Sequence, residues 1–185
     1  MPDSMKVVLL SDQFRGSYHI LGNLYERCLN GEREVTHLPS PHSKEEREAL
    51  DCRGAIVLHN TLGEGFVPIP GCHNVAMPLH EWSEYPHEWI GYLNKFDEIW
   101  TSTAHIREVL VRGGLKPPSF LLPPALDQED FVPKDDWRIE GKPSFLFVGE
   151  PHFRKGNHLL IHGYLKAFPN PDQARLTIKT SPGCP

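Results

Sequence analysis

The sequence predicts an α/β fold: a Rossmann-like parallel sheet with helices on both faces, followed by one β-α-β unit of a second such domain. Short apolar runs alternate with segments whose apolar residues recur at helical spacing, which is the order of a parallel sheet. The runs are continuous rather than alternating, as in strands that are buried on both faces.

The apolar runs predict the positions of the strands. The parallel sheet is expected to contain five buried strands, and one further segment, 34–38, is a candidate for another. The five expected strands cover residues 6–10, 55–59, 74–79, 98–101 and 119–122.

Helices are expected between these strands. Apolar residues at i, i+3, i+4 and i+7 predict helices around 21–28 and 89–96, and a third around 106–110 ends at Gly113. A short charged helix is expected at 43–50, where Ser43 and Glu46 have the spacing of a capping box.

The composition of the chain changes after the strand expected at 119–122. Residues 125–141 are charged, contain Pro133 and follow neither period, which predicts a linker between a domain at 1–124 and a second one at 142–185. The second piece is predicted to hold a strand at 145–148, a loop at 149–155, a helix at 161–168 and a strand at 176–178. Such a unit is too small for an ordinary domain, so we expect the chain to stop inside it.

Composition excludes several classes of protein. A net charge of −5 argues against a nucleic-acid binder with a broad basic surface. No apolar run approaches the roughly 18 residues of a membrane helix, and the run near the start is too short for a signal peptide, so we expect a cytoplasmic protein, with peripheral membrane contact left open. The four cysteines are too widely spaced for CxxC pairs, which favours free thiols.

One set of segments resembles a known family. Taken in order, they resemble the retaining nucleotide-sugar glycosyltransferases of family four, which have the GT-B architecture of two facing Rossmann-like domains. The segments are FDEIWTS (96–102), LPPALD (122–127), FVP (131–133), FLFVG (145–149) and RKG (154–156).

The resemblance implies an activity. The protein would transfer a sugar, with retention, from a nucleoside diphosphate sugar to the hydroxyl of a glycan, lipid-linked or other acceptor, without a metal or a further cofactor. Residues 1–124 would form the acceptor side, and residues 142–185 would begin the donor side. The family's late Glu-x7-Glu pair has no counterpart in the 185 residues, and Glu150 stands where many members carry arginine. We therefore expect these 185 residues alone to bind nucleotide weakly and to transfer no sugar.

The donor diphosphate is expected at two loops that each follow a strand. Gly149, Arg154 and Lys155 lie between a predicted strand and a predicted helix, where cations stabilise the charge of a departing diphosphate. The resemblance makes them diphosphate ligands, and the alternative is a solvated pair of cations. Gly16 would let the backbone approach the phosphates, and the alternative is an ordinary turn.

The acceptor side and the reacting centre are expected just after the buried strand at 74–79. By resemblance, His80 and Glu81 would lie at the reacting centre, with His80 orienting the acceptor, and Trp82 could stack on a sugar. His59 could line the acceptor side, although a hydrogen-bonded loop histidine is the simpler interpretation. A metal site around His80 and His87 is disfavoured because the intervening loop has no fixed geometry.

The same scaffold is compatible with functions other than sugar transfer. A non-catalytic nucleotide or sugar-phosphate binding module could use the same scaffold, because a fold alone does not fix function. An NAD enzyme or a phosphate-ester enzyme is disfavoured, since no GxGxxG follows the first strand. Trp89 and Trp100 are predicted to pack in the core, and His158 and His162 are predicted to lie on the surface. The edges of strands 145–148 and 176–178 are expected to pair with another chain, which predicts a dimer or larger association.

Overall fold

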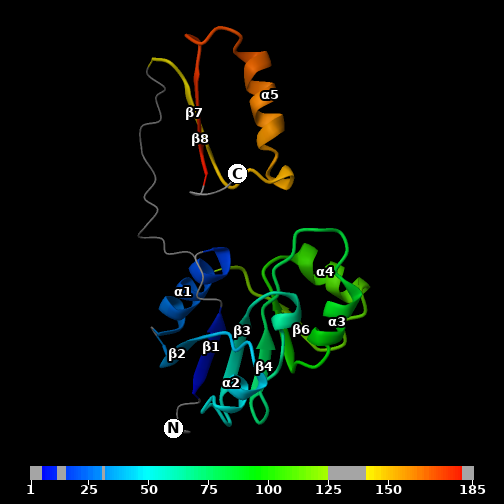
Figure 1. Cartoon of the computed structure of the whole chain (residues 1–185). Coiled ribbons are helices and arrows are strands. Elements are labelled where there is room, and N and C mark those ends of the chain that lie inside the picture. The colour runs from blue at the N-terminus through cyan, green and yellow to red at the C-terminus, as the bar shows by residue number, and fades with distance from the viewer. Residues whose placement is uncertain (1–5, 12–15, 31, 125–140, 181–185) are drawn as a thin grey trace. The chain divides into compact units, whose positions relative to one another are not determined.

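The computed structural model describes residues 6–11, 16–30, 32–124 and 141–180 (Figure 1). The chain divides into two compact units, Met1–Phe131 and Val132–Pro185, and each is described here by itself. The division falls within the predicted linker, but its residues 125–140 lie outside the described part of the chain.

The first unit is built on a six-stranded sheet in the order β2-β1-β3-β4-β5-β6, and every neighbouring pair is parallel. This confirms the predicted fold class. The candidate strand at 34–38 corresponds to β2, which is an edge strand beside β1. The strands are β1 (Val7–Ser11), β2 (Val35–Pro39), β3 (Ile56–Asn60), β4 (His73–Ala76), β5 (Glu98–Thr101) and β6 (Ser119–Leu121).

Helices pack on both faces of this sheet, and α1 lies on the opposite side of the strands from α3 and α4 (Figure 1). Val7 and Leu9 of β1 pack on the side of α1, whereas Val8 and Leu10 pack on the other side. Burial on both faces explains why the strand sequence is apolar without alternation. The helices are α1 (Ser17–Asn30), α2 (Lys44–Glu48), α3 (His87–Leu93) and α4 (Ala104–Arg112), with a 3-10 turn, η1 (Gly63–Gly65).

The end of β4 and the cap of α2 differ from the sequence prediction for physical reasons. β4 ends at Ala76 rather than continuing to residue 79, because Pro78 has no N–H to donate to a neighbouring strand. At α2, the Glu46 N–H donates to Ser43 Oγ over 3.0 Å as a capping box requires, but the Glu46 carboxylate accepts from the His42 N–H instead of that of Ser43.

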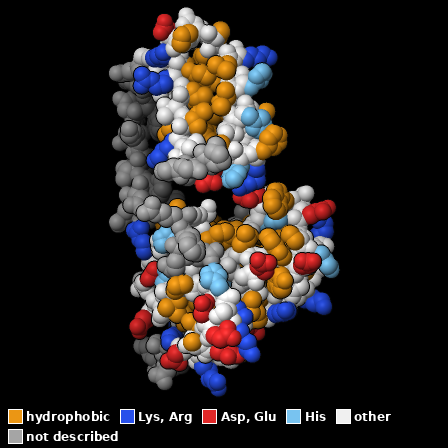
Figure 2. Space-filling view, in the orientation of Figure 1, with side chains coloured by type: hydrophobic (Ala, Val, Ile, Leu, Met, Phe, Trp, Pro, Cys, Tyr) orange, Lys and Arg blue, Asp and Glu red, His pale blue; other side chains and the backbone are white. Residues whose placement is uncertain are grey.

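The second unit is one β-α-β piece made of β7 (Ser144–Val148), α5 (Asn157–Ala167) and β8 (Arg175–Lys179), with β7 parallel to β8. Phe145 packs its ring against Tyr164 and Phe168 at the end of α5. The predicted loop at 149–155 is partly wrong, because Phe153–Lys155 forms a 3-10 turn, η3. Leu146 and Val148 are 68% and 64% exposed, and Figure 2 shows hydrophobic side chains gathered on one face of this unit.

Candidate functional site

The strand order identifies one edge of the first sheet as the place where a ligand would be held. The chain leaves β1 toward β2 on one side and later returns to place β3 on the other side of β1. In an open α/β sheet, ligands bind at the carboxyl ends of strands next to such a switch point. This edge, called the carboxyl edge below, includes Ser11, Gly16, Asn60 and the chain that follows β4. Gly16 is exposed, and its carbonyl accepts the first hydrogen bond of α1 from the Ile20 N–H over 3.1 Å.

His80 lies in the chain after β4 and is held in one orientation. Its Nε2 contacts the carbonyl oxygen of Glu84 at 2.6 Å, and its ring makes edge contacts with Tyr85 and Trp82 at centroid distances of 4.7 and 5.5 Å. A carbonyl only accepts, so Nε2 is the nitrogen that donates, which leaves Nδ1 as the ring atom that can accept. His80 can therefore accept a hydrogen bond or a proton through Nδ1.

The loop from His80 to Pro86 is fastened to α4 through its backbone. His105 Nε2 donates to the Trp82 carbonyl at 3.3 Å, and the Arg112 guanidinium donates to the Ser83 carbonyl. Glu81 is exposed, and Trp82 is 59% exposed. The loop is thus fixed at several points while the indole of Trp82 keeps an apolar face open to solvent.

Tyr85 places a buried phenol beside His80. Its side chain is 7% exposed, packs edge-on against Trp89 at 5.6 Å, and its hydroxyl has no hydrogen-bond partner among the described residues. Burial raises the pKa of Tyr85 far above its ordinary value, and the neighbouring Tyr18 phenol raises it further. The hydroxyl is therefore neutral and able to donate. Sequence reasoning missed this residue because its position resembles any aromatic in a loop.

His59 and Asn60 end β3 but face inward. The His59 ring is 2% exposed, donates from Nε2 to Asn74 Oδ1 at 3.0 Å, and meets Phe96 edge-on at 4.9 Å. Burial lowers its pKa to about 4, so the ring is neutral. Asn60 Nδ2 donates to the Tyr18 carbonyl at 2.8 Å and so positions the start of α1. A direct contact between His59 and an acceptor stays a prediction.

A serine–histidine–glutamate relay, which sequence reasoning missed, lies under α1. Ser11 Oγ is 2.6 Å from His37 Nε2, and His37 Nδ1 is 2.8 Å from Glu26 Oε2. Such a chain activates serine in hydrolases, but Ser11 has no exposed surface here. A Cβ on Gly22 of α1 would lie only 2.5 Å from Ser11 Oγ. The relay therefore ties α1 to β1 and β2, and its members are too far apart in sequence to form a recognisable motif.

The second unit places the predicted diphosphate ligands in the connection from β7 to α5. Gly149 follows β7 directly, and its N–H donates to the Lys179 carbonyl at 3.0 Å. Arg154 and Lys155 are both exposed in η3. Gly156 joins η3 to α5 with a left-handed φ of 70°, which strongly favours glycine. The cations therefore lie at the carboxyl end of a parallel strand, as the sequence predicted.

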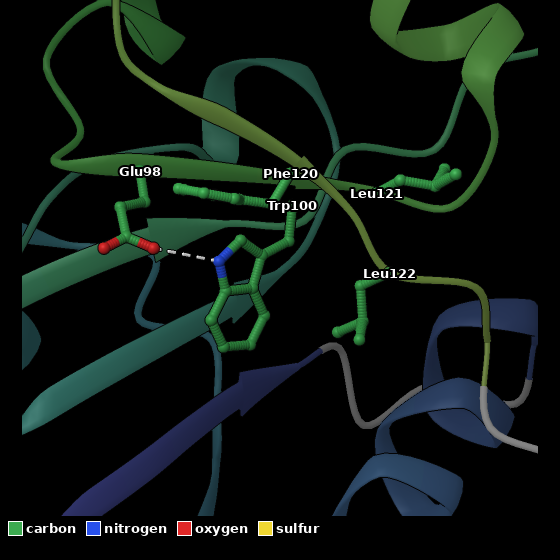
Figure 3. A pocket seen from close by; sticks show the side chains of 5 residues that line it. All are labelled: Glu98, Trp100, Phe120, Leu121 and Leu122. Atoms are coloured by element: carbon green, nitrogen blue, oxygen red, sulfur yellow. Dashed lines mark hydrogen bonds between the residues drawn. The ribbon is translucent and has the colours of Figure 1, made fainter.

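A separate pocket lies on the face of the first sheet where β5 meets β6. It has a volume of about 270 Å³, and Figure 3 shows the Trp100 indole N–H directed at the Glu98 carboxylate, 3.0 Å away. The pocket is lined by Glu98, Trp100, Phe120, Leu121 and Leu122. None of the predicted site residues lines it. Trp100 and Trp89 are partly buried against the two main apolar clusters, in agreement with their predicted packing role.

The part of the chain that the structure describes shows neither a cluster of metal ligands nor a membrane-spanning helix. In this part of the chain, no group of three or more His, Cys, Asp or Glu side chains is arranged to hold a metal ion. None of the helices over the same residues has the length and apolar character needed to cross a membrane.

Comparison with known proteins adds no family to these observations. No protein-family model matches the chain, and no curated protein matches it. A parallel α/β scaffold hosts many unrelated activities, so function has to be argued from the chemistry of the site residues.

Proposed function

We propose that the protein is a retaining glycosyltransferase of the GT-B type that moves a sugar from a nucleoside diphosphate sugar to an acceptor hydroxyl. The observation that carries this proposal is the position of Arg154 and Lys155, two exposed cations at the carboxyl end of β7 and directly before α5. The order of segments that resembles family four of the glycosyltransferases supports the same assignment.

The chemistry of the donor fits these residues. When the bond between the anomeric carbon and the diphosphate breaks, negative charge develops on the phosphate oxygens. A guanidinium can contact two of those oxygens at once, and an ammonium acts as a compact point charge. Cations already placed there stabilise the charge as it forms. In our proposal, Arg154 and Lys155 take this role and the glycine turns on either side let a phosphate approach.

The acceptor chemistry fits the region around His80. The lone pair on Nδ1 can accept a hydrogen bond from an acceptor hydroxyl and hold it in place. The exposed face of Trp82, beside this ring, offers an apolar surface on which a sugar can stack. We propose that His80 orients the acceptor, that Glu81 is its neighbour in the same exposed loop, and that Trp82 contacts the acceptor sugar.

Binding of nucleoside diphosphates to the 185-residue chain tests the donor side. Replacing Lys155 by Ala should weaken binding of UDP or GDP by about 1–3 kcal/mol, or roughly 5- to 150-fold, as expected for a lost charge-assisted hydrogen bond. Isothermal calorimetry measures the change. Lys166→Ala is the matched control, because Lys166 is an exposed lysine in the last turn of α5, whereas Lys155 precedes that helix. Equal affinity of wild type and Lys155→Ala for the nucleoside diphosphate would show that Arg154 and Lys155 are solvated surface cations and not diphosphate ligands.

Release of nucleoside diphosphate distinguishes the enzyme from a binding module. The full natural protein is incubated with a panel of nucleoside diphosphate sugars and simple glycan acceptors, and the released nucleoside diphosphate is measured against a buffer blank. Release that disappears in Lys155→Ala and in His80→Ala supports a transferase. Binding that depends on Lys155, without release in the full natural protein, would support the non-catalytic module instead.

A further inference from the structure

Two cysteines meet at the amino ends of β3 and β4, on the edge of the first sheet opposite the carboxyl edge. Cys52 lies just before β3 and Cys72 just before β4, and their sulfur atoms are 3.5 Å apart. The Cys72 thiol also lies 2.9 Å from the Cys52 carbonyl oxygen. Both are free thiols in the structure. No CxxC spacing marks the pair, so only the fold brings the two residues together.

The backbone around the two cysteines holds them side by side. The Gly54 N–H donates to the Gly71 carbonyl at 2.8 Å, and the His73 N–H donates to the Ala55 carbonyl at 3.0 Å. The segments that carry the two thiols are therefore already bonded to each other. A disulfide has a sulfur–sulfur distance near 2.05 Å, so the sulfurs need to approach by about 1.5 Å.

The two thiols differ in a way that sets the order of a reaction. Cys52 is 3% exposed, whereas Cys72 is half-buried and reachable from solvent. Burial raises the pKa of Cys52 to about 11, and the contact with the Cys72 thiol adds to this rise, while the nearby Lys6 ammonium acts in the opposite direction. An oxidant therefore meets Cys72 first, and Cys52 is placed to react second.

We propose that Cys52 and Cys72 form a reversible disulfide when the protein meets a peroxide. The Cys72 thiolate attacks one oxygen of hydrogen peroxide, the O–O bond breaks, and the departing hydroxide takes up a proton, which leaves a sulfenic acid on Cys72. The Cys52 sulfur then attacks the Cys72 sulfur, its own proton leaves, and the S–O bond breaks to release a second water. The two thiols lose two electrons and two protons, and one peroxide becomes two waters.

The disulfide would close a loop that contains all of β3. The two cysteines are 20 positions apart, and the loop between them carries His59 and Asn60 at the carboxyl edge. Closing a loop of this length removes conformations from the unfolded chain. We expect oxidation to raise the Tm of the first unit by roughly 5–10 °C.

The test is peptide mapping of the whole 185-residue chain. The reduced protein is treated with a small excess of hydrogen peroxide, the remaining thiols are alkylated, and the digest is analysed without reducing agent. We expect a linked peptide pair containing Cys52 and Cys72, a mass lower by two hydrogen atoms, and full reversal by dithiothreitol. Cys28→Ser is the control, because Cys28 is exposed on α1 and should leave the linked pair unchanged.

Two outcomes would overturn the proposal. One is oxidation of Cys28 in the wild-type chain while Cys52 and Cys72 remain alkylated as free thiols. The other is a disulfide between Cys52 and Cys72 that forms equally well in urea, which would show that the folded structure does not promote the reaction between the two thiols. Both readouts use the wild-type chain, so they stand even if Cys72→Ser fails to fold.

Discussion

Single residues in this protein hold helix and sheet together through buried polar contacts. Ser11, His37 and Glu26 form a relay beneath α1, in which Ser11 and His37 are buried and Glu26 is partly exposed at the outer end. The close approach of the helix depends on Gly22, since any side chain there would enter the space of Ser11. The buried ring of His59 likewise has one hydrogen bond to Asn74 in place of its contact with water.

Gly22→Ala should destabilise the first unit. The added Cβ would lie 2.5 Å from Ser11 Oγ, and overpacking of this kind costs about 1–3 kcal/mol. Gly91→Ala is the matched control: it also lies within a helix, its Cβ would meet nothing within 4 Å, and helix propensity should stabilise it by up to about 1 kcal/mol. Urea unfolding followed by tryptophan fluorescence measures both. Equal effects of the two changes would contradict the contact.

His59 should make stability depend on pH. Its pKa is about 4 in the folded protein and 6.5 ordinarily, so below pH 6.5 the unfolded chain binds a proton that the folded chain refuses. The free energy of unfolding therefore falls by about 3 kcal/mol on this account as pH drops from 6.5 to about 4. His59→Gln keeps a donor for Asn74 and lacks this titration. Carboxylates contribute equally to the pH dependence of both proteins. If the free energy of unfolding falls in parallel for wild type and variant, the lowered pKa of His59 is refuted.

At the scale of elements, short helices gain their stability from what they bury and how they begin. α4 buries Ile106, Val109 and Leu110, whereas α2 buries no residue. Both begin with a side-chain cap, which is Thr103 for α4 and Ser43 for α2. The consequence of losing a cap should therefore differ between the two helices.

Thr103→Ala should destabilise the first unit by about 1 kcal/mol, because the Ile106 N–H loses the Thr103 Oγ1 acceptor that lies 3.2 Å away. Ser43→Ala removes an equivalent bond from α2, but its effect on global unfolding should be smaller because α2 can fray without exposing buried residues. Thermal unfolding monitored by circular dichroism compares them. A larger shift for Ser43→Ala would be inconsistent with this account.

At the scale of the whole molecule, the two units bury their sheets unequally. The first sheet is covered on both faces, but β7 carries Leu146 and Val148 largely exposed to solvent. Exposed apolar strands and unpaired strand edges invite pairing with another chain. A chain with this distribution of apolar surface is expected to associate with itself.

The 185-residue chain should therefore form dimers or larger species as its concentration rises, and changing Leu146 and Val148 to Lys should suppress this. Light scattering coupled to gel filtration measures the mass. Val111→Lys is the control, since Val111 is 55% exposed on α4 of the first unit. A clean monomer at high concentration for the wild type would contradict the prediction.

The sequence by itself determined the class of the fold and the place of nearly every element. Continuous apolar runs specify strands that are buried on both faces, and helical spacing specifies the faces that cover them; both are local patterns. It also placed Arg154 and Lys155 after a strand and before a helix. Even the main error was local: residues 77–79 continue the apolar pattern of β4, but Pro78 cannot donate to a ladder.

Only the tertiary structure decided which distant residues meet. Ser11 with His37, and Cys52 with Cys72, each come together because neighbouring parallel strands bring the ends of separate segments to one edge. No short spacing records such a pairing. The direction of a side chain was likewise beyond the sequence: His59 and Asn60 end a strand at the carboxyl edge, yet both turn inward because buried polar atoms must find partners there.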